Sequence, residues 1–83
     1  MAFKRTNTKN TSFTYDVLEE CGTVATNDKG WEMKLRFMSW NGGEPKYDLR
    51  YWYTKDGEER STKGITLTTE EIEGLQKLLN EIN

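Results

Sequence analysis

Apolar and polar residues alternate every second position over much of this 83-residue chain, which is the spacing of a β-strand with two unlike faces. The alternation is clearest over residues 31–40. One face of this predicted strand carries Trp31, Met33, Leu35 and Phe37. The other face carries Glu32, Lys34, Arg36, Met38 and Trp40. Glycine and proline follow over residues 41–45 and end the strand, since proline cannot donate a ladder hydrogen bond.

Three further strands are predicted around this one. Residues 13–17 alternate, and a strand that continues to residue 26 needs a bulge or a change of face near Gly22. Residues 46–53 alternate in the same way, and residues 60–67 can form the returning strand of a hairpin. Turn-forming residues separate the four strands at 27–30, 41–45 and 55–58.

The hydrophobic period changes after residue 67 from two to between three and four, which indicates an amphipathic helix. Thr68 and Glu71 fit a capping box, with Thr68 as the N-cap. The apolar stripe of this helix consists of Ile72, Leu75, Leu79 and Ile82. The element order predicts an α+β fold of type β-β-β-β-α. We expect one domain over residues 13–83, after a disordered tail over residues 1–12, which are polar and have no period.

One helix can cover only one face of a four-stranded sheet. Its stripe needs an apolar partner, and we expect this partner to be the face with Trp31, Met33, Leu35, Phe37 and Leu49. The opposite face then exposes Lys34, Arg36, Trp40, Arg50 and Trp52. Aromatic rings stack on bases, contributing ~1–3 kcal/mol per base, and basic groups neutralise phosphates. This face therefore indicates nucleic-acid binding. A protein-interaction module is the alternative, because Trp, Tyr and Arg are also the commonest hot-spot residues of protein interfaces.

Composition narrows the classes of function. The net charge of −2 does not indicate nucleic-acid binding, but a mildly acidic protein can still carry one basic face. The chain has no histidine and one cysteine, Cys21, which excludes an internal disulfide and argues against a four-ligand zinc site. No cofactor or metal is expected. Cys21 has no histidine to activate it, and we expect it to be buried. The paired glutamates are expected to be solvated, so the sequence predicts no catalytic residue and no enzyme.

Length and cysteine content indicate the cellular compartment and the association state of the protein. A single cysteine suits a reducing compartment, and no stretch has the apolar length of a signal peptide or a membrane span. We therefore expect a soluble cytoplasmic protein, associated with the nucleoid, without a membrane or a small-molecule substrate as partner. A chain this short buries a modest core, which favours association with a second copy.

Several short motifs resemble the transcriptional positive cofactor 4 family. They are Tyr-Asp-Leu-Arg-Tyr-Trp-Tyr at 47–53, Lys-Asp-Gly-Glu at 55–58, and Lys-Gly-Ile-Thr-Leu at 63–67 before a Glu-rich helix. Lys29-Gly30-Trp31 and the stretch from Ser39 to Asp48 are more similar still to the small bacterial branch, the YdbC-like proteins. The resemblance covers residues 15 to 83.

This resemblance implies a strongly curved β-β-β-β-α fold, a homodimer, and binding of single-stranded DNA without strong sequence preference. It places Trp40 near a base-stacking aromatic and Arg50 at a backbone contact. The remaining implied nucleic-acid-binding residues are Lys34, Arg36, Tyr53 and Lys63. The alternation places Trp52 on the exposed face, whereas the resemblance implies that Tyr53 contacts the nucleic acid. Trp52 and Tyr53 are therefore both kept as candidate contact residues. The helix stripe can pack wholly within the chain, but its regularity also suits packing against the same helix of a second copy. The expected dimer interface is therefore Ile72, Leu75, Leu79 and Ile82. DNA or RNA preference and the cellular process stay open, and coactivator function is not transferred.

Overall fold

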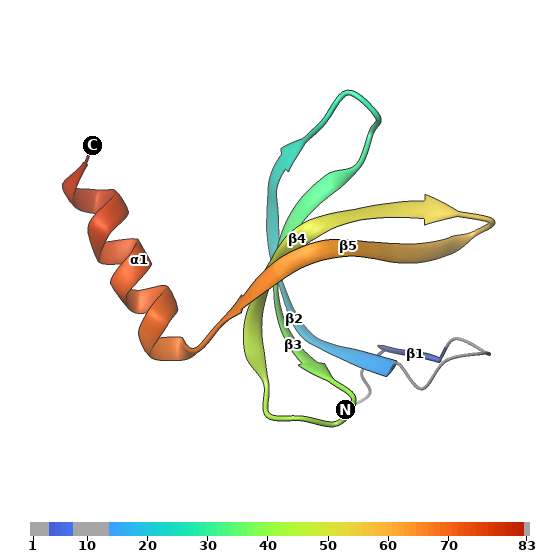
Figure 1. Ribbon diagram of the computed structural model, residues 1–83, viewed down its shortest axis with the longest axis horizontal. Helices are drawn as coiled ribbons and strands as arrows, with labels where there is room; N and C mark the ends of the chain where they lie inside the picture. Colours follow the sequence, from blue (N-terminus) through green and yellow to red (C-terminus); the bar gives the residue numbers. More distant parts are fainter. Residues whose placement is uncertain (1–3, 8–13, 83) are drawn as a thin grey trace.

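The computed structural model describes residues 4–7 and 14–82 (Figure 1). One open antiparallel sheet holds five strands in chain order, and one helix follows it, which confirms the predicted α+β class and the C-terminal helix. The elements are β1 (Lys4–Asn7), β2 (Thr14–Thr26), β3 (Glu32–Trp40), β4 (Lys46–Lys55), β5 (Glu58–Leu67) and α1 (Thr69–Glu81).

Strand β1 is a correction to the predicted polar tail. Lys4–Asn7 pair antiparallel with β2, in a register that sets Lys4 against Val17 and Asn7 against Thr14. An edge strand pairs through its backbone and needs no apolar alternation, so the hydrophobic pattern does not reveal it. The other residues of the predicted tail, and Phe13 of the first predicted strand, lie outside the described residues.

Strand β2 is bent by irregularities in its pairing with β3. The register shifts between Val17 and Glu19, and again between Glu20 and Gly22. The predicted bulge near Gly22 is therefore confirmed. Bulges bend a strand and increase its twist, and the β2–β3 and β4–β5 hairpins diverge at their tips (Figure 1).

The sheet curls toward one face. Strands β2 and β4 are not neighbours, yet the rings of Tyr15 and Trp52 lie 5.4 Å apart between centroids. We call this concave side the inner face. Its side chains from β2, β3 and β4 include Tyr15, Lys34, Arg36, Met38, Trp40, Asp48, Arg50 and Trp52. The opposite, outer face includes Trp31, Met33, Leu35, Phe37, Tyr47, Leu49, Tyr51 and Tyr53.

The small core lies on the inner face. Tyr15, Met38 and Trp52 are buried, with Val17 and Trp40 packed against them. The prediction that this face is open is therefore wrong for Trp52 and Arg36, which are 2% and 3% exposed. Alternation along a strand separates the two faces correctly, but it does not show toward which face the sheet will curl.

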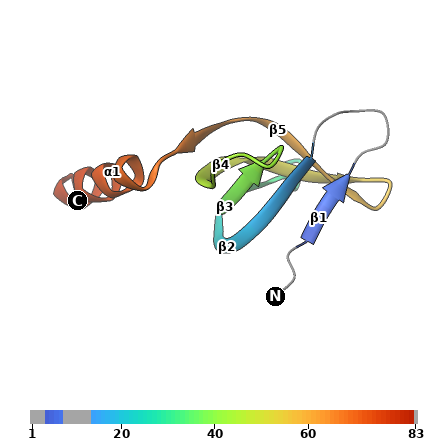
Figure 2. The same cartoon turned by 90° about the horizontal axis from the view of Figure 1, so that it is seen from below.

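Helix α1 begins as predicted. Thr68 Oγ1 accepts a hydrogen bond from the Glu71 amide at 3.1 Å, and the Thr68 amide donates to Glu71 Oε1 at 2.8 Å, which confirms the capping box. The helix then extends away from the sheet and has no buried residue (Figure 1, Figure 2). Its stripe therefore does not cover the apolar sheet face in the single chain, contrary to the expected packing. No helix in the described part of the chain is long and apolar enough to cross a membrane.

Candidate nucleic-acid interface

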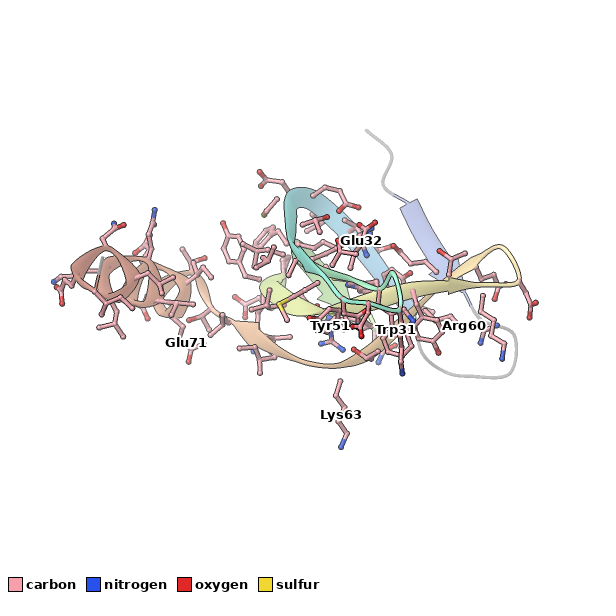
Figure 3. The ribbon with its side chains drawn as sticks, turned by 90° about the horizontal axis from the view of Figure 1, so that it is seen from above. Trp31, Glu32, Tyr51, Arg60, Lys63 and Glu71 are labelled. Atoms are coloured by element: carbon pink, nitrogen blue, oxygen red, sulfur yellow. The ribbon has the colours of Figure 1, made fainter. Side chains whose placement is uncertain are left out.

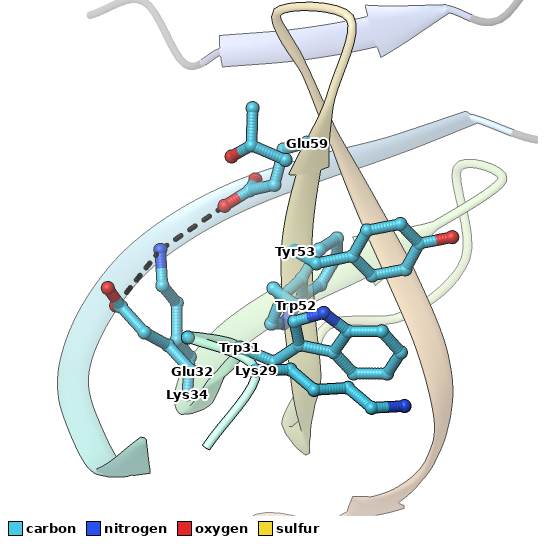
Figure 4. A pocket seen from close by; sticks show the side chains of 9 residues that line it. Lys29, Trp31, Glu32, Lys34, Trp52, Tyr53 and Glu59 are labelled. Atoms are coloured by element: carbon cyan, nitrogen blue, oxygen red, sulfur yellow. Dashed lines mark hydrogen bonds and ion pairs between the residues drawn. The ribbon is translucent and has the colours of Figure 1, made fainter. Parts of the chain in front are cut away.

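A three-layer stack lies on the outer face where the two hairpins diverge. The rings of Trp31 and Tyr53 are stacked, with centroids 4.6 Å apart and planes 20° from parallel. The ammonium of Lys29 lies 5.0 Å from the Trp31 ring centroid, a cation–π distance (Figure 4). Both rings are half-buried, so each keeps surface that a ligand can reach.

Local structure explains why these residues meet. The side-chain oxygen of Asn27 accepts hydrogen bonds from the amides of Lys29 and Trp31, at 2.9 and 3.0 Å, and this fixes the turn between β2 and β3. The β3–β4 register pairs Glu32 with Trp52, which sets Trp31 opposite Tyr53. A cleft of about 280 Å³ adjoins the stack. Its lining includes Trp31 and Tyr53 of the stack, and also Lys34, Trp52 and Glu59 from the inner side of the sheet.

Two more basic side chains extend this outer surface along β5. Arg60 is the cross-strand partner of Tyr53 and lies 3.4 Å from Glu58. Lys63 is exposed and projects from the same side of the sheet as Trp31, whereas Glu32 projects from the other side (Figure 3). We call this surface the outer patch; it consists of Lys29, Trp31, Tyr53, Arg60 and Lys63.

A second aromatic–basic unit lies on the inner face. The Asp48 carboxylate is fully buried and accepts hydrogen bonds from Arg50 Nε and Nη2 at 2.7 and 2.6 Å. It also accepts one from the Trp40 indole at 3.0 Å, and the Arg50 guanidinium lies 4.6 Å from the Trp40 ring centroid. Trp40 and Arg50, two predicted binding residues, therefore lie together beside a cleft of about 500 Å³ that Lys46 also lines.

The other predicted residues of the inner face are engaged by acidic side chains. Arg36 donates from Nη1 and Nη2 to Glu59 at 3.1 and 2.9 Å, and from Nε to Glu20 at 2.9 Å. Lys34 donates to Glu59 at 3.2 Å. Burial lowers the pKa of Arg36, but its hydrogen bonds to Glu59 and Glu20 outweigh burial and raise it, so the guanidinium stays charged.

Trp52 is the most buried of the predicted binding residues. The residue is 2% exposed, and its ring packs against the Arg36 guanidinium, whose Cζ lies 4.6 Å from the ring centroid. Tyr53, the other candidate, is half-buried on the outer face. Of the two, Tyr53 is the side chain with accessible ring surface.

The predicted binding set therefore combines residues from two faces that the structure separates. Tyr53 and Lys63 belong to the outer patch, and Trp40 and Arg50 lie on the inner face. Sequence reasoning missed Lys29, Trp31 and Arg60 as surface residues. It assigned Trp31 to a covered face, although the Lys-Gly-Trp motif had already marked that position.

Cys21 differs from its expected burial, since it is exposed on β2. Partial desolvation raises the pKa of its thiol, and the neighbouring charges of Glu19 and Glu20 raise it further. A raised pKa keeps the thiol protonated near neutral pH, which makes it a poor nucleophile.

Comparison with known proteins identifies relatives of this chain. Residues 27–78 match a family model described as Transcriptional Coactivator p15 (PC4). An uncharacterized protein of Treponema pallidum (strain Nichols) is 40% identical over 74 residues, which cover 89% of this chain and 85% of that relative. The matched segment of the family model contains the whole outer patch.

Proposed function

Because the chain belongs to the Transcriptional Coactivator p15 (PC4) family, we propose that it binds single-stranded DNA without strong sequence preference. The family is one of nucleic-acid-binding domains without enzymatic activity. The ligand we propose is a single strand exposed during transcription, replication or repair in the cytoplasm, close to the nucleoid. No small-molecule substrate is part of the proposal.

The observation that carries the proposal is the stack of Lys29, Trp31 and Tyr53 on an accessible surface. An unpaired base offers a π-face to such a stack whatever its sequence, and each stacked base contributes ~1–3 kcal/mol. Duplex DNA keeps its bases stacked inside, so this contact selects single strands. Tyr53 is the proposed stacking residue, and Trp31 supports its ring from behind, because Trp31 lies between Tyr53 and Lys29.

Phosphate contacts supply the second part of the proposal. Lys29, Arg60 and Lys63 lie on the same side of the sheet as the stack, and the Arg60 side chain is 41% exposed although its Nη2 pairs with Glu58. Neutralising phosphates releases counterions, so affinity should fall with salt. We assign a secondary contact to Trp40 and Lys46, which lie beside the inner-face cleft. Lys34, Arg36, Arg50 and Trp52 are not assigned a contact, because they are paired or buried.

The test is fluorescence anisotropy of a labelled oligo-dT strand, titrated at two salt concentrations with the matching duplex as competitor. We expect tight, salt-sensitive binding that the duplex does not displace. Tyr53→Ala should weaken binding by about 1–3 kcal/mol. Lys29→Gln should weaken it and flatten the salt dependence, whereas Lys77→Gln on α1, which makes the same charge change far from the patch, should not.

Absence of binding at micromolar protein would overturn the proposal and assign the aromatic surface to a polypeptide partner instead. An oligo-U strand compared with an oligo-dU strand separates DNA from RNA preference, since these two strands differ by the 2′-hydroxyl alone. Circular dichroism of each variant confirms that a lost affinity does not reflect a lost fold.

A further inference from the structure

The inner face carries an ion network that the proposed function does not use. We infer that Glu59 acts as an internal counter-ion that occupies Lys34 and Arg36, keeps phosphates off the inner face beside them, and so confines the strand's main contacts to the outer patch. This inference rests on the proposed single-strand binding. It makes Glu59 a specificity-determining residue that touches no nucleic acid.

The geometry of Glu59 resembles that of a bound phosphate. Its two carboxylate oxygens accept two parallel hydrogen bonds from the Arg36 guanidinium, at 3.1 and 2.9 Å. One of them also accepts from Lys34 at 3.2 Å. Guanidinium groups bind phosphate through the same two-pronged arrangement. The donors that a backbone phosphate needs are thus already occupied.

The exposed fractions of the side chains show that Glu59 and Glu20 shield Arg36 from solvent. The Arg36 side chain is 4% exposed, whereas those of Glu59 and Glu20 are 32% and 58% exposed. The acidic side chains therefore lie between Arg36 and solvent. A cleft of about 520 Å³ opens beside them, and its charged lining residues are Glu20, Glu58, Glu59 and Arg36. With three carboxylates and one guanidinium, the lining of this cleft repels the phosphates of a nucleic acid. Unfavourable contacts of this kind can determine where a ligand binds.

The primary test compares Glu59→Gln with Glu73→Gln, which makes the same change in net charge on the exposed surface of α1. Glutamine keeps the size and one acceptor oxygen of Glu59 but loses its charge. We expect Glu59→Gln to bind oligo-dT several-fold more tightly than wild type. Its salt dependence should steepen by about 0.7 in log–log slope for each phosphate gained. Equal affinities for the two variants would overturn the inference.

A second variant decides the question even if Glu59→Gln does not fold. Because Glu59 neutralises Lys34 in the wild-type chain, Lys34→Gln should change the affinity less than twofold, whereas Lys29→Gln should weaken it clearly. If Lys34→Gln weakens binding as much as Lys29→Gln does, Lys34 contacts the strand and the inference is wrong.

The two levels of proposal fail in different ways. Failure of single-strand binding itself appears as a wild-type protein that does not bind oligo-dT. Failure of the counter-ion role appears as a wild-type protein that binds, with Glu59→Gln no tighter than Glu73→Gln. If the double variant Lys34→Gln/Glu59→Gln loses the tighter oligo-dT binding that Glu59→Gln shows, this supports the counter-ion role.

Discussion

Gly64 is the residue that lets Arg50 lie against β5. The two are cross-strand partners. A Cβ added to Gly64 would overlap the Cβ of Arg50 and lie 2.5 Å from the Leu49 carbonyl oxygen. These atoms belong to the backbone or lie next to it, so they cannot swing aside. The close approach lets Arg50 Nη1 donate to the Thr62 carbonyl at 3.2 Å while the guanidinium stays on Asp48.

Gly64→Ala should therefore destabilise the fold, by about 1–3 kcal/mol, as overpacking usually does. Urea unfolding followed by tryptophan fluorescence measures the change. Thr66→Ala, at an exposed position of the same strand, is the matched control and should cost much less. Equal unfolding midpoints for the two variants would mean that β5 can shift to accommodate the added methyl group.

The charge of Glu59 links stability to pH. Burial raises the pKa of this carboxyl group, but its hydrogen bonds and the charges of Arg36 and Lys34 outweigh burial and bring it below the ordinary 4.5. A lowered pKa in the folded state means that the ionised carboxylate stabilises the fold. This contribution is complete above about pH 4.5 and is lost as the pH falls through the lowered value.

Unfolding free energies at pH 7 and pH 3 test this linkage. The charged and titratable groups around the carboxylate are Arg36, Lys34, Glu20, Glu32, Glu58 and the Tyr15 hydroxyl. Wild type should exceed Glu59→Gln in stability at pH 7, and the difference should shrink at pH 3. Glu73→Gln should show no such trend. A difference that stays constant with pH would contradict the predicted linkage.

At the scale of elements, α1 depends on its own first turn. Among the described strands, the helix contacts β4 and β5 alone, and it has no buried residue, so packing on the sheet supports it little. The capping box between Thr68 and Glu71 is then a main source of local stability. It satisfies two backbone amides that otherwise have no partner in the helix.

Thr68→Ala should therefore cost about 1 kcal/mol of helix stability. Amide hydrogen exchange across residues 69–75 measures it, since loss of the cap should speed exchange in the first turns. Thr69→Ala, one position inside the helix, is the control and should slow exchange slightly or leave it unchanged, because alanine is the best helix former. Similar acceleration in both variants would show that the cap contributes little.

The sequence predicts those features that depend on neighbouring residues. The capping box, the turn at 27–30 and the bulge near Gly22 all follow from local patterns, and the structure contains each of them. The direction of curling does not follow, because it depends on contacts between strands that are not neighbours, such as Tyr15 with Trp52. The same dependence on distant contacts limits how far the candidate site can be predicted from the sequence. Tyr53 and Trp31 both lie in motifs, but the accessibility of Trp31 depends on which face of the sheet stays open.

At the scale of the whole molecule, one chain leaves much apolar surface uncovered. The buried apolar core is Tyr15, Met38 and Trp52 among the described residues, while Ile65 on β5 and Ile82 at the end of α1 are 54% and 69% exposed. The outer face near α1 is also apolar and only half-buried. A second copy can cover both surfaces, as short domains often require. We therefore predict a homodimer joined through the α1 stripe of Ile72, Leu75, Leu79 and Ile82.

Sedimentation equilibrium should give twice the 9.7 kDa mass of one chain at micromolar concentration. Leu75→Asp should shift the protein toward monomer, because a charge at the centre of the stripe would be buried without a partner in the dimer. Asn80→Asp adds the same charge away from the stripe and should leave the dimer intact. Since Leu75 is partly exposed in the single chain, the sheet should survive the substitution, and near-ultraviolet circular dichroism can verify this. A wild-type protein that sediments as a monomer at all concentrations would contradict the dimer, and the uncovered stripe would then have to pack on a different protein.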